Sequence, residues 1–273
     1  MKNTELCIPD LAPDTFLVDT HCHLDMDGYQ DDFAGVLKRA KQCHVKNIIT
    51  IGIDLSSSKR AVQLAQSYKQ ITAAIGTHPH DVANMTDETY QKLEQLYTAN
   101  RTHIVGYGEI GLDYVKQHSP PEVQREHFEK QLELAARLKL PVIIHNREAD
   151  HDTLDILKRA APLEAGGIMH CFSGDCHMAK KIMDLGMLIS IPGIVTFKNA
   201  KKLMEVAATI PLSKMVLETD GPFLAPTPFR GKRNEPAYVG YTAARVAELR
   251  NTTTDRIARV TTDNAYKLFN LRN

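Results

Sequence analysis

Apolar and polar segments alternate along this chain with a regular spacing. Short runs of consecutive apolar residues are followed by longer segments in which apolar positions recur every three or four residues. The short runs predict strands over residues 16–18, 47–53, 71–75, 104–107, 141–144, 167–169, 187–191 and 214–217. The periodic segments predict helices over residues 31–44, 57–68, 87–97, 121–138, 152–161, 175–185 and 200–208, with two further helical stretches between 240 and 271.

The predicted strands are apolar at successive positions, which is typical of a parallel sheet buried on both faces. Eight strands, each followed by helical sequence, predict an α/β fold of the (β/α)8 TIM-barrel type. We expect one barrel domain over residues 16–273, preceded by an N-terminal extension over residues 1–15. The alternative is a doubly wound open sheet, but no glycine-rich dinucleotide fingerprint follows the first strand.

Side chains that commonly bind metal ions follow several of the predicted strands. His21 and His23 follow the first strand and share one face of it. On its own, this pair indicates either a metal site or two unrelated histidines, one hydrogen-bonded and one exposed. Further candidates follow the fourth, fifth, sixth and eighth strands: Glu109, His145, His170 and Asp220. The carboxyl ends of barrel strands converge on one face, and buried charge is costly without a partner. The set therefore predicts a divalent-metal centre, with room for two ions roughly 3.5–4 Å apart if a carboxylate bridges them.

Composition narrows the function classes. The 273 residues carry no net charge, which argues against a protein that coats duplex DNA but leaves room for a local site that holds a nucleic-acid end. Five cysteines in no regular framework predict a reducing, cytoplasmic compartment, with Cys171 and Cys176 as small core residues rather than thiolate ligands. We expect no signal peptide and no membrane-spanning segment.

Seven motifs, in order from about Phe16 to the C-terminus, resemble those of the TatD-type metal-dependent hydrolases, which are amidohydrolase-like barrels. They are residues 18–25 (VDTHCHLD), 76–80 (GTHPH), 108–114 (GEIGLDY), 145–147 (HNR), 170–174 (HCFSG), 218–220 (ETD) and 230–236 (RGKRNEP). The resemblance implies metal-dependent deoxyribonuclease activity, including 3′-to-5′ exonuclease trimming. Gly221 stands where many relatives have serine, and we do not expect this to change the metal site.

The resemblance also implies the ligand set. One metal would be held by His21, His23 and Asp220, the other by His145 and His170, with Glu109 bridging the two. Related barrels often bridge with a carboxylated lysine, and residues 104–111 contain none. Zinc, manganese, nickel, iron or magnesium would suit these ligands and would lower the pKa of a shared water. Asp220 is then the candidate general base, or else a purely structural ligand.

Cationic side chains near these ligands are candidates for gripping phosphate. Arg147 shares a strand face with His145 and offers a planar fork to a phosphate. Residues 230–233 contain three cations, which either contact a phosphate backbone or form solvated surface. Of the three, Arg230 is the candidate substrate-binding residue. Tyr114 is either a stacking platform for a base or an ordinary loop residue.

Other polar side chains at strand ends have two interpretations each. His78 and His80 follow the third strand, where they either donate to a phosphate oxygen or shape the loop. Glu218 shares the face of Asp220 and is expected to orient a metal-binding histidine or Arg230 rather than bind metal itself.

The leading prediction is a phosphodiesterase that acts on DNA, at single strands or 3′ ends, without a membrane or an obligate protein partner. A second possibility keeps the metal centre but hydrolyses a non-nucleic-acid ester or amide, such as a lactone or aminoacyl ester. A third is a catalytically silent binding module, against which the complete ligand set argues.

Overall fold

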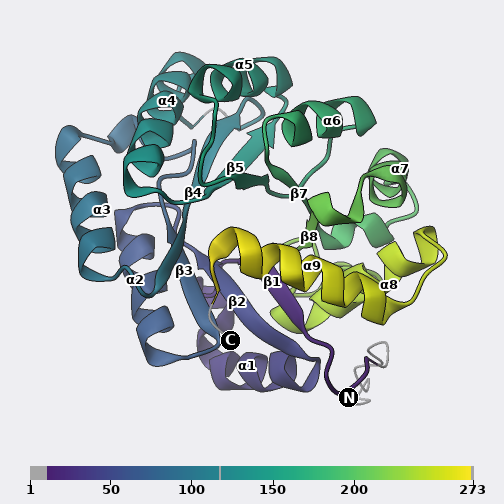
Figure 1. The fold of residues 1–273 in the computed structure, drawn as a ribbon. Coiled ribbons are helices and arrows are strands. Elements are labelled where there is room, and N and C mark those ends of the chain that lie inside the picture. The colour runs from purple at the N-terminus through teal and green to yellow at the C-terminus, as the bar shows by residue number, and fades with distance from the viewer. Residues whose placement is uncertain (1–10, 117, 272–273) are drawn as a thin grey trace.

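Eight parallel strands form the centre of the molecule (Figure 1). The computed structural model describes residues 11–116 and 118–271. The strands are β1 (Leu17–Cys22), β2 (Val45–Ile51), β3 (Ile71–Ile75), β4 (Ile104–Asp113), β5 (Val142–Arg147), β6 (Gly167–Met169), β7 (Leu188–Ile191) and β8 (Met215–Leu217). Each strand pairs with the next along the chain, in the order β1 to β8, as in a (β/α)8 barrel.

The ring closes between the segments that follow β1 and β8. A parallel bridge joins Cys22 to Gly221. The Asp220 N–H donates to the His21 carbonyl at 2.8 Å, and the His23 N–H donates to the Gly221 carbonyl at 2.7 Å. The predicted TIM barrel is therefore confirmed, and the open doubly wound sheet is wrong. The same closure places three predicted metal ligands side by side.

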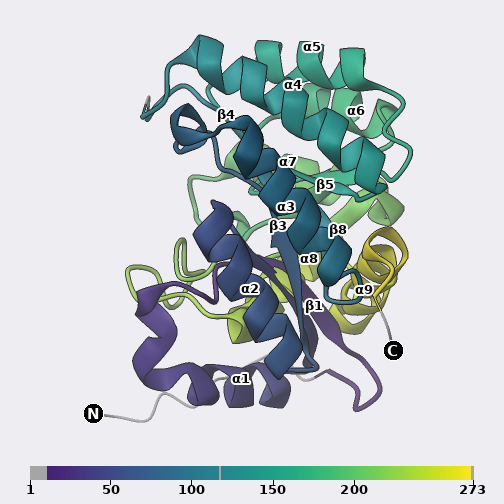
Figure 2. The same cartoon turned by 90° about the vertical axis from the view of Figure 1, so that its left-hand side faces the viewer.

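Helices surround this barrel, and Figure 2 shows α2, α3 and α4 along its outer side. They are α1 (Phe33–Gln42), α2 (Leu55–Ser67), α3 (Asp87–Ala99), α4 (Pro121–Leu138), α5 (Asp150–Ala160), α6 (Cys176–Asp184), α7 (Lys201–Thr209), α8 (Val239–Leu249) and α9 (Thr254–Phe269). Short 3-10 turns cover Asp27–Asp32, Val82–Asn84, Gly193–Thr196, Leu212–Lys214 and Pro236–Tyr238. The predicted helices all occur, with ends displaced by a few residues at most positions, and Pro121 begins α4 as expected.

The barrel interior is apolar at the end where the strands begin. Val18, Ile49, Ile143 and Val216 pack together there with other strand residues, and Phe269 at the end of α9 joins them. Figure 1 shows α9 crossing this part of the sheet. Apolar side chains thus fill the interior of the barrel near the strand starts, whereas the predicted metal ligands lie where the strands finish.

Strand β4 is longer than predicted. The sequence indicated a strand that stops at Tyr107, whereas the structure continues it to Asp113. Between Tyr107 and Ile110 the pairing with β5 shifts register, because β4 carries one extra residue there. Glycine makes the continuation possible: a Cβ at Gly111 would lie 2.0 Å from the His145 carbonyl oxygen. Glu109 therefore sits inside a strand, at a bulge that aims it into the barrel.

The predicted N-terminal extension over residues 1–15 stays a prediction. Residues 1–10, including Cys7, lie outside the described residues. Leu11 is buried in the core, and the Ala12 N–H donates to the Asp255 carboxylate of α9 at 2.9 Å. None of the helices described here is long and apolar enough to cross a membrane.

Candidate metal centre

Four predicted ligands form one tight group at the carboxyl end of β1. His21 Nε2 lies 3.3 Å from both His23 Nε2 and Glu109 Oε2, and 3.8 Å from Asp220 Oδ1. His23 Nε2 lies 3.5 Å from Asp220 Oδ1 and 3.7 Å from Glu109 Oε2. Four donors held about 2.0–2.1 Å from one tetrahedral ion lie about 3.4 Å apart. The spacing of these atoms therefore fits a single divalent cation.

A second group surrounds the other oxygen of Glu109. Glu109 Oε1 lies 2.6 Å from His145 Nδ1, 3.1 Å from His170 Nε2 and 3.6 Å from His78 Nε2. The structure thus brings His145 and His170 to Glu109 as the resemblance implied. The structure also brings His78 to Glu109, although the sequence predicted that His78 either binds a substrate phosphate or shapes its loop. Glu109 offers one oxygen to each group, which is the arrangement of a bridging carboxylate.

Burial makes this donor set hard to explain without a cation. His21 is fully buried, and its ring stacks on His170 with centroids 3.6 Å apart. Two imidazoles this close cannot both be positively charged at low cost, whereas both can bind metal as neutral ligands. Nitrogen and carboxylate oxygen donors in one pocket suit zinc and other divalent transition metals. The residues present therefore fit a metal centre.

The charges of the site are balanced between its carboxylates and imidazoles. Burial alone would raise the pKa of Glu109, but the charges of His170 and His78 and a hydrogen bond from His145 hold it well below its ordinary value. Burial likewise lowers the pKa of His170, but Glu109 and Glu218 outweigh it and raise that pKa well above its ordinary value. Ionised carboxylates thus face imidazoles that hold protons, and a bound cation would displace those protons.

Glu218 lies behind His170 and is fully buried. Its Oε2 accepts from the Ser190 hydroxyl at 2.6 Å, and its Oε1 accepts from the Cys171 N–H at 2.6 Å. Oε1 also lies 3.3 Å from His170 Nδ1, the ring nitrogen that faces away from Glu109. Glu218 was predicted to orient either a metal-binding histidine or Arg230. In the structure its partner is His170.

Replacing Glu218 with glutamine should weaken metal binding by about 10- to 100-fold, since partners of metal-binding histidines have effects of this size. Glutamine keeps the shape and can still accept from the Cys171 N–H, but it removes the negative charge beside His170. Competition with a fluorescent chelator measures the affinity. Glu205→Gln, at an exposed position of α7, is the matched control. Equal affinities for the two variants would contradict this role.

Asp113 is a site residue that the sequence analysis missed. His80 Nε2 donates to its Oδ2 at 2.9 Å, and His145 Nε2 lies 3.4 Å from the same oxygen. The N–H groups of Val115 and Lys116 donate to its Oδ1 at 2.9 Å. His80 is thus paired with a carboxylate. Glu109 and Asp113 share a face only because β4 runs on to Asp113, beyond the predicted end of the strand at Tyr107.

Asp19 was also missed. It accepts hydrogen bonds from the hydroxyl and N–H of Thr219 and from the His21 N–H. Burial raises the pKa of Asp19 to about 8, although these hydrogen bonds act in the opposite direction. The carboxyl fixes the backbone at the ends of β1 and β8, next to His21 and Asp220. A carboxyl directly after the apolar run of residues 16–18 was the signal in the sequence.

The predicted phosphate-binding cations have different surroundings. Arg147 is exposed at the end of β5, close enough to act electrostatically on the Cys171 thiol. Arg230 is exposed and lies over the Phe197 ring at 4.5 Å. Arg233 instead donates to the Gly28 carbonyl at 2.8 Å and to the Asp32 carboxylate at 3.1 Å. Arg147 and Arg230 therefore remain candidates for phosphate, whereas Arg233 is committed to structural contacts.

Two aromatic residues were candidates for, or could provide, base stacking: Tyr114, which the sequence analysis weighed, and Phe223, which it did not. Tyr114 donates its hydroxyl to Asp152 at 2.7 Å, which fits the ordinary role better than base stacking. Phe223 follows Asp220 closely, is 47% exposed, and lies edge-on to His23 with ring centroids 6.1 Å apart. Sequence reasoning missed Phe223, because exposure of one loop residue depends on how the whole loop folds.

The two cysteines predicted to be small core residues have different surroundings. Cys176 is partly buried and packs against the hydrophobic core, as predicted, whereas Cys171 lies among the ligand atoms of His170 and Asp220, so the core prediction is wrong for Cys171. Burial raises the pKa of the Cys171 thiol well above its ordinary value, so it stays protonated. The chain turns directly after β6, and this turn brings Cys171 to the rim of the metal centre instead of the core.

Comparison with known proteins identifies the family. The family model described as TatD related DNase matches residues 18–270. That match covers nearly the whole chain. The chain belongs to the TatD family. It is 45% identical over 255 residues to an uncharacterized metal-dependent hydrolase, YabD of Bacillus subtilis, covering 93% of this chain and 99% of that protein. Membership in the TatD family confirms the resemblance found in the motifs.

Solved structures agree with this assignment. The TatD homologue YjjV from Escherichia coli superposes with a TM-score of 0.89 at 34% identity, covering 94% of this chain and 98% of that one. An organophosphorus hydrolase from Deinococcus radiodurans shares the barrel alone, with a TM-score of 0.58 at 13% identity. This TatD-family chain is therefore a metal-dependent hydrolase, and its clustered histidines and carboxylates are the candidate metal ligands.

Proposed function

We propose that this protein hydrolyses phosphodiester bonds in DNA, removing nucleotides from the 3′ ends of single strands in the cytoplasm with the help of two divalent cations. The observation that carries the proposal is Glu109, which presents one oxygen to each of two ligand groups. Paired sites that share a carboxylate are typical of enzymes that cleave phosphate esters. The description of the matching family as TatD related DNase supports the same substrate.

The roles of the protein side chains follow from their positions. When bound, two divalent cations would supply Lewis acidity that activates water and neutralises charge on the phosphate. Burial raises the pKa of Asp220, but a hydrogen bond from His23 and the charges of His170 and His21 outweigh it and lower that pKa, so the carboxylate is ionised at neutral pH. Asp220 can therefore accept the proton of the attacking water. Asp113 and Glu218 hold His145 and His170 in place.

Exposed side chains at the rim of the metal centre would bind the substrate. Arg147 and Arg230 can donate to phosphate oxygens, because neither forms an ion pair with a described carboxylate. Phe223 presents an exposed ring beside His23, where a terminal base can stack. Local cations and one aromatic ring suit a short single strand better than a duplex, which agrees with the zero net charge of the chain.

Replacing Phe223 with alanine should raise KM for a single-stranded oligonucleotide by roughly tenfold with a smaller change in kcat, since stacking one base on an aromatic ring has an energy of that order. Steady-state kinetics on a short oligonucleotide measure both constants. Phe16→Ala is the matched control, because Phe16 is 38% exposed but lies next to the start of β1, at the opposite end of the barrel. A KM that does not change in Phe223→Ala would exclude stacking at this ring.

The function itself is tested with a 5′-labelled single-stranded DNA oligomer. We expect a ladder of products that shortens from the 3′ end when metal is present and no products when a chelator is added. An intact oligomer with metal-loaded protein would contradict the proposal. The metal centre would then act on another ester or an amide, and lactones and aminoacyl esters would be assayed next.

A further inference from the structure

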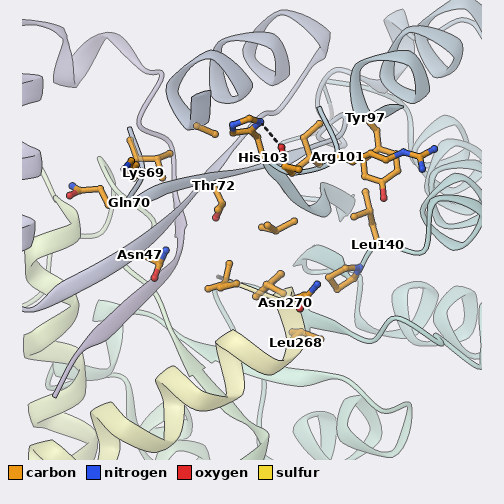
Figure 3. A pocket seen from close by; sticks show the side chains of 18 of the residues that line it. Asn47, Lys69, Gln70, Thr72, Tyr97, Arg101, His103, Leu140, Leu268 and Asn270 are labelled. Atoms are coloured by element: carbon orange, nitrogen blue, oxygen red, sulfur yellow. Dashed lines mark hydrogen bonds between the residues drawn. The ribbon is translucent and has the colours of Figure 1, made fainter. Parts of the chain in front are cut away.

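A large cavity lies at the end of the barrel opposite the metal centre. Its volume is about 970 Å³, and Asn47, Thr72 and Ile104 line it from the starts of β2, β3 and β4. The end of α9 forms another wall through Leu268 and Asn270 (Figure 3). Parallel strands have their starts at one end and their carboxyl ends at the other. The cavity is therefore separate from the predicted metal ligands.

The charged side chains of the described residues that line the cavity are all cationic. Four cations line it: Lys46, Lys69, Arg101 and Lys139. Among the described residues that line it there is no aspartate or glutamate, although the chain as a whole has 33 acidic and 33 basic residues. Within the described ranges, none of these four cations forms an ion pair with a carboxylate. Arg101 lies over the Tyr97 ring at 5.6 Å, and Lys46 over the Phe16 ring at 5.2 Å.

Polar atoms without partners lie in the same wall. Thr72 Oγ1 and Gln70 Nε2 are buried, and neither has a hydrogen-bond partner among the described residues. Figure 3 shows both side chains at the cavity, with His103 nearby. A buried polar group without a partner is destabilising, so such groups mark a place where a ligand or water completes the structure. Here the surrounding cations favour a ligand with several anionic oxygens.

We propose that this cavity binds a small polyphosphate, either as a nucleoside di- or triphosphate or as a short inorganic chain. The four cations would pair with the phosphates, and Thr72 and Gln70 would donate to phosphate oxygens. Leu140, Leu268 and Tyr97 form an apolar part of the wall that can take a nucleoside. The volume lies within the range of small-molecule sites. None of the candidate metal ligands among the described residues lies in this wall, so we propose a binding site there rather than a second catalytic centre.

Calorimetric titration of the full chain, as purified and without added metal, tests this site. We expect tripolyphosphate and ATP each to bind saturably at one site per chain, and adenosine not to bind. The double variant Lys69→Glu, Arg101→Glu should weaken both by at least about 30-fold, since each substitution replaces a charge-assisted contact with a repulsion. Both positions are exposed, so the variant is expected to fold, which its thermal midpoint verifies.

Two further variants control for other sites. Lys38→Glu, Lys59→Glu changes the same number of charges at exposed positions away from the cavity and should bind normally. Glu109→Gln should also bind normally, because its change lies at the metal centre. The proposal is overturned if tripolyphosphate does not bind, if the Lys69 and Arg101 variant binds like the Lys38 and Lys59 variant, or if Glu109→Gln abolishes binding. A higher affinity for ATP than for tripolyphosphate would indicate that the site binds a nucleotide rather than an inorganic chain.

Discussion

Replacing Glu109 with glutamine should lower the rate of the proposed DNA hydrolysis by more than about 100-fold. Outer partners of metal ligands already have effects of 10- to 100-fold, and among the described residues Glu109 is the carboxylate that contacts both ligand groups. Glutamine has nearly the same shape but no charge, and its amide nitrogen cannot bind a cation. We therefore expect the metal content of the purified variant to fall together with its activity.

The matched control for Glu109→Gln is Glu133→Gln, at an exposed position of α4. This substitution makes the same chemical change away from the site. The variant should therefore retain the metal content and the hydrolysis rate of the unmodified protein. Circular dichroism on both variants separates loss of function from loss of fold. A Glu109→Gln protein with normal metal content and normal rate would mean that the two ligand groups do not depend on a shared carboxylate.

Reversing the charge of Arg147 should distinguish a phosphodiesterase from a hydrolase of neutral esters. Arg147→Glu places a negative charge where the substrate phosphate is proposed to bind, and charge-assisted contacts of this kind contribute about 1.5–3 kcal/mol before repulsion is added. We expect kcat/KM for a single-stranded oligonucleotide to fall by roughly 100-fold or more. Hydrolysis of a neutral aryl ester by the same preparation should change by less than about threefold.

The comparison needs a control for long-range charge effects, since any added negative charge slows the approach of DNA. Lys38→Glu, on the exposed side of α1, gives that baseline at matched ionic strength. Equal losses in Arg147→Glu and Lys38→Glu would remove Arg147 from the substrate site. Equal losses on the oligonucleotide and on the neutral ester would favour the second class of substrate.

The features that could be predicted from the sequence were those set by local patterns. Apolar runs between amphipathic helices are enough to predict a parallel barrel, because each strand is buried on both faces. Polar residues directly after those runs must then meet at one end, which is why His21, His145 and His170 could be placed together. These predictions needed no knowledge of how distant loops fold.

The features that could not be predicted depend on contacts between distant segments. The bulge that aims Glu109 inward arises from a register shift between β4 and β5, which a strand ending at Tyr107 does not allow. Arg233 was grouped with the phosphate-binding cations, but its guanidinium donates a hydrogen bond to Asp32, about two hundred residues earlier in the chain. The pairing of His80 with Asp113 likewise joins two strand ends.

The most direct test of the account is a metal titration of activity. Protein depleted of metal with a chelator should not shorten a 5′-labelled single-stranded DNA oligomer. Adding manganese or zinc in steps should restore hydrolysis, and the rate should level off near two equivalents per chain, one for each ligand group around Glu109. Hydrolysis that persists in the depleted protein, or fully loaded protein that leaves the oligomer intact, would contradict the account.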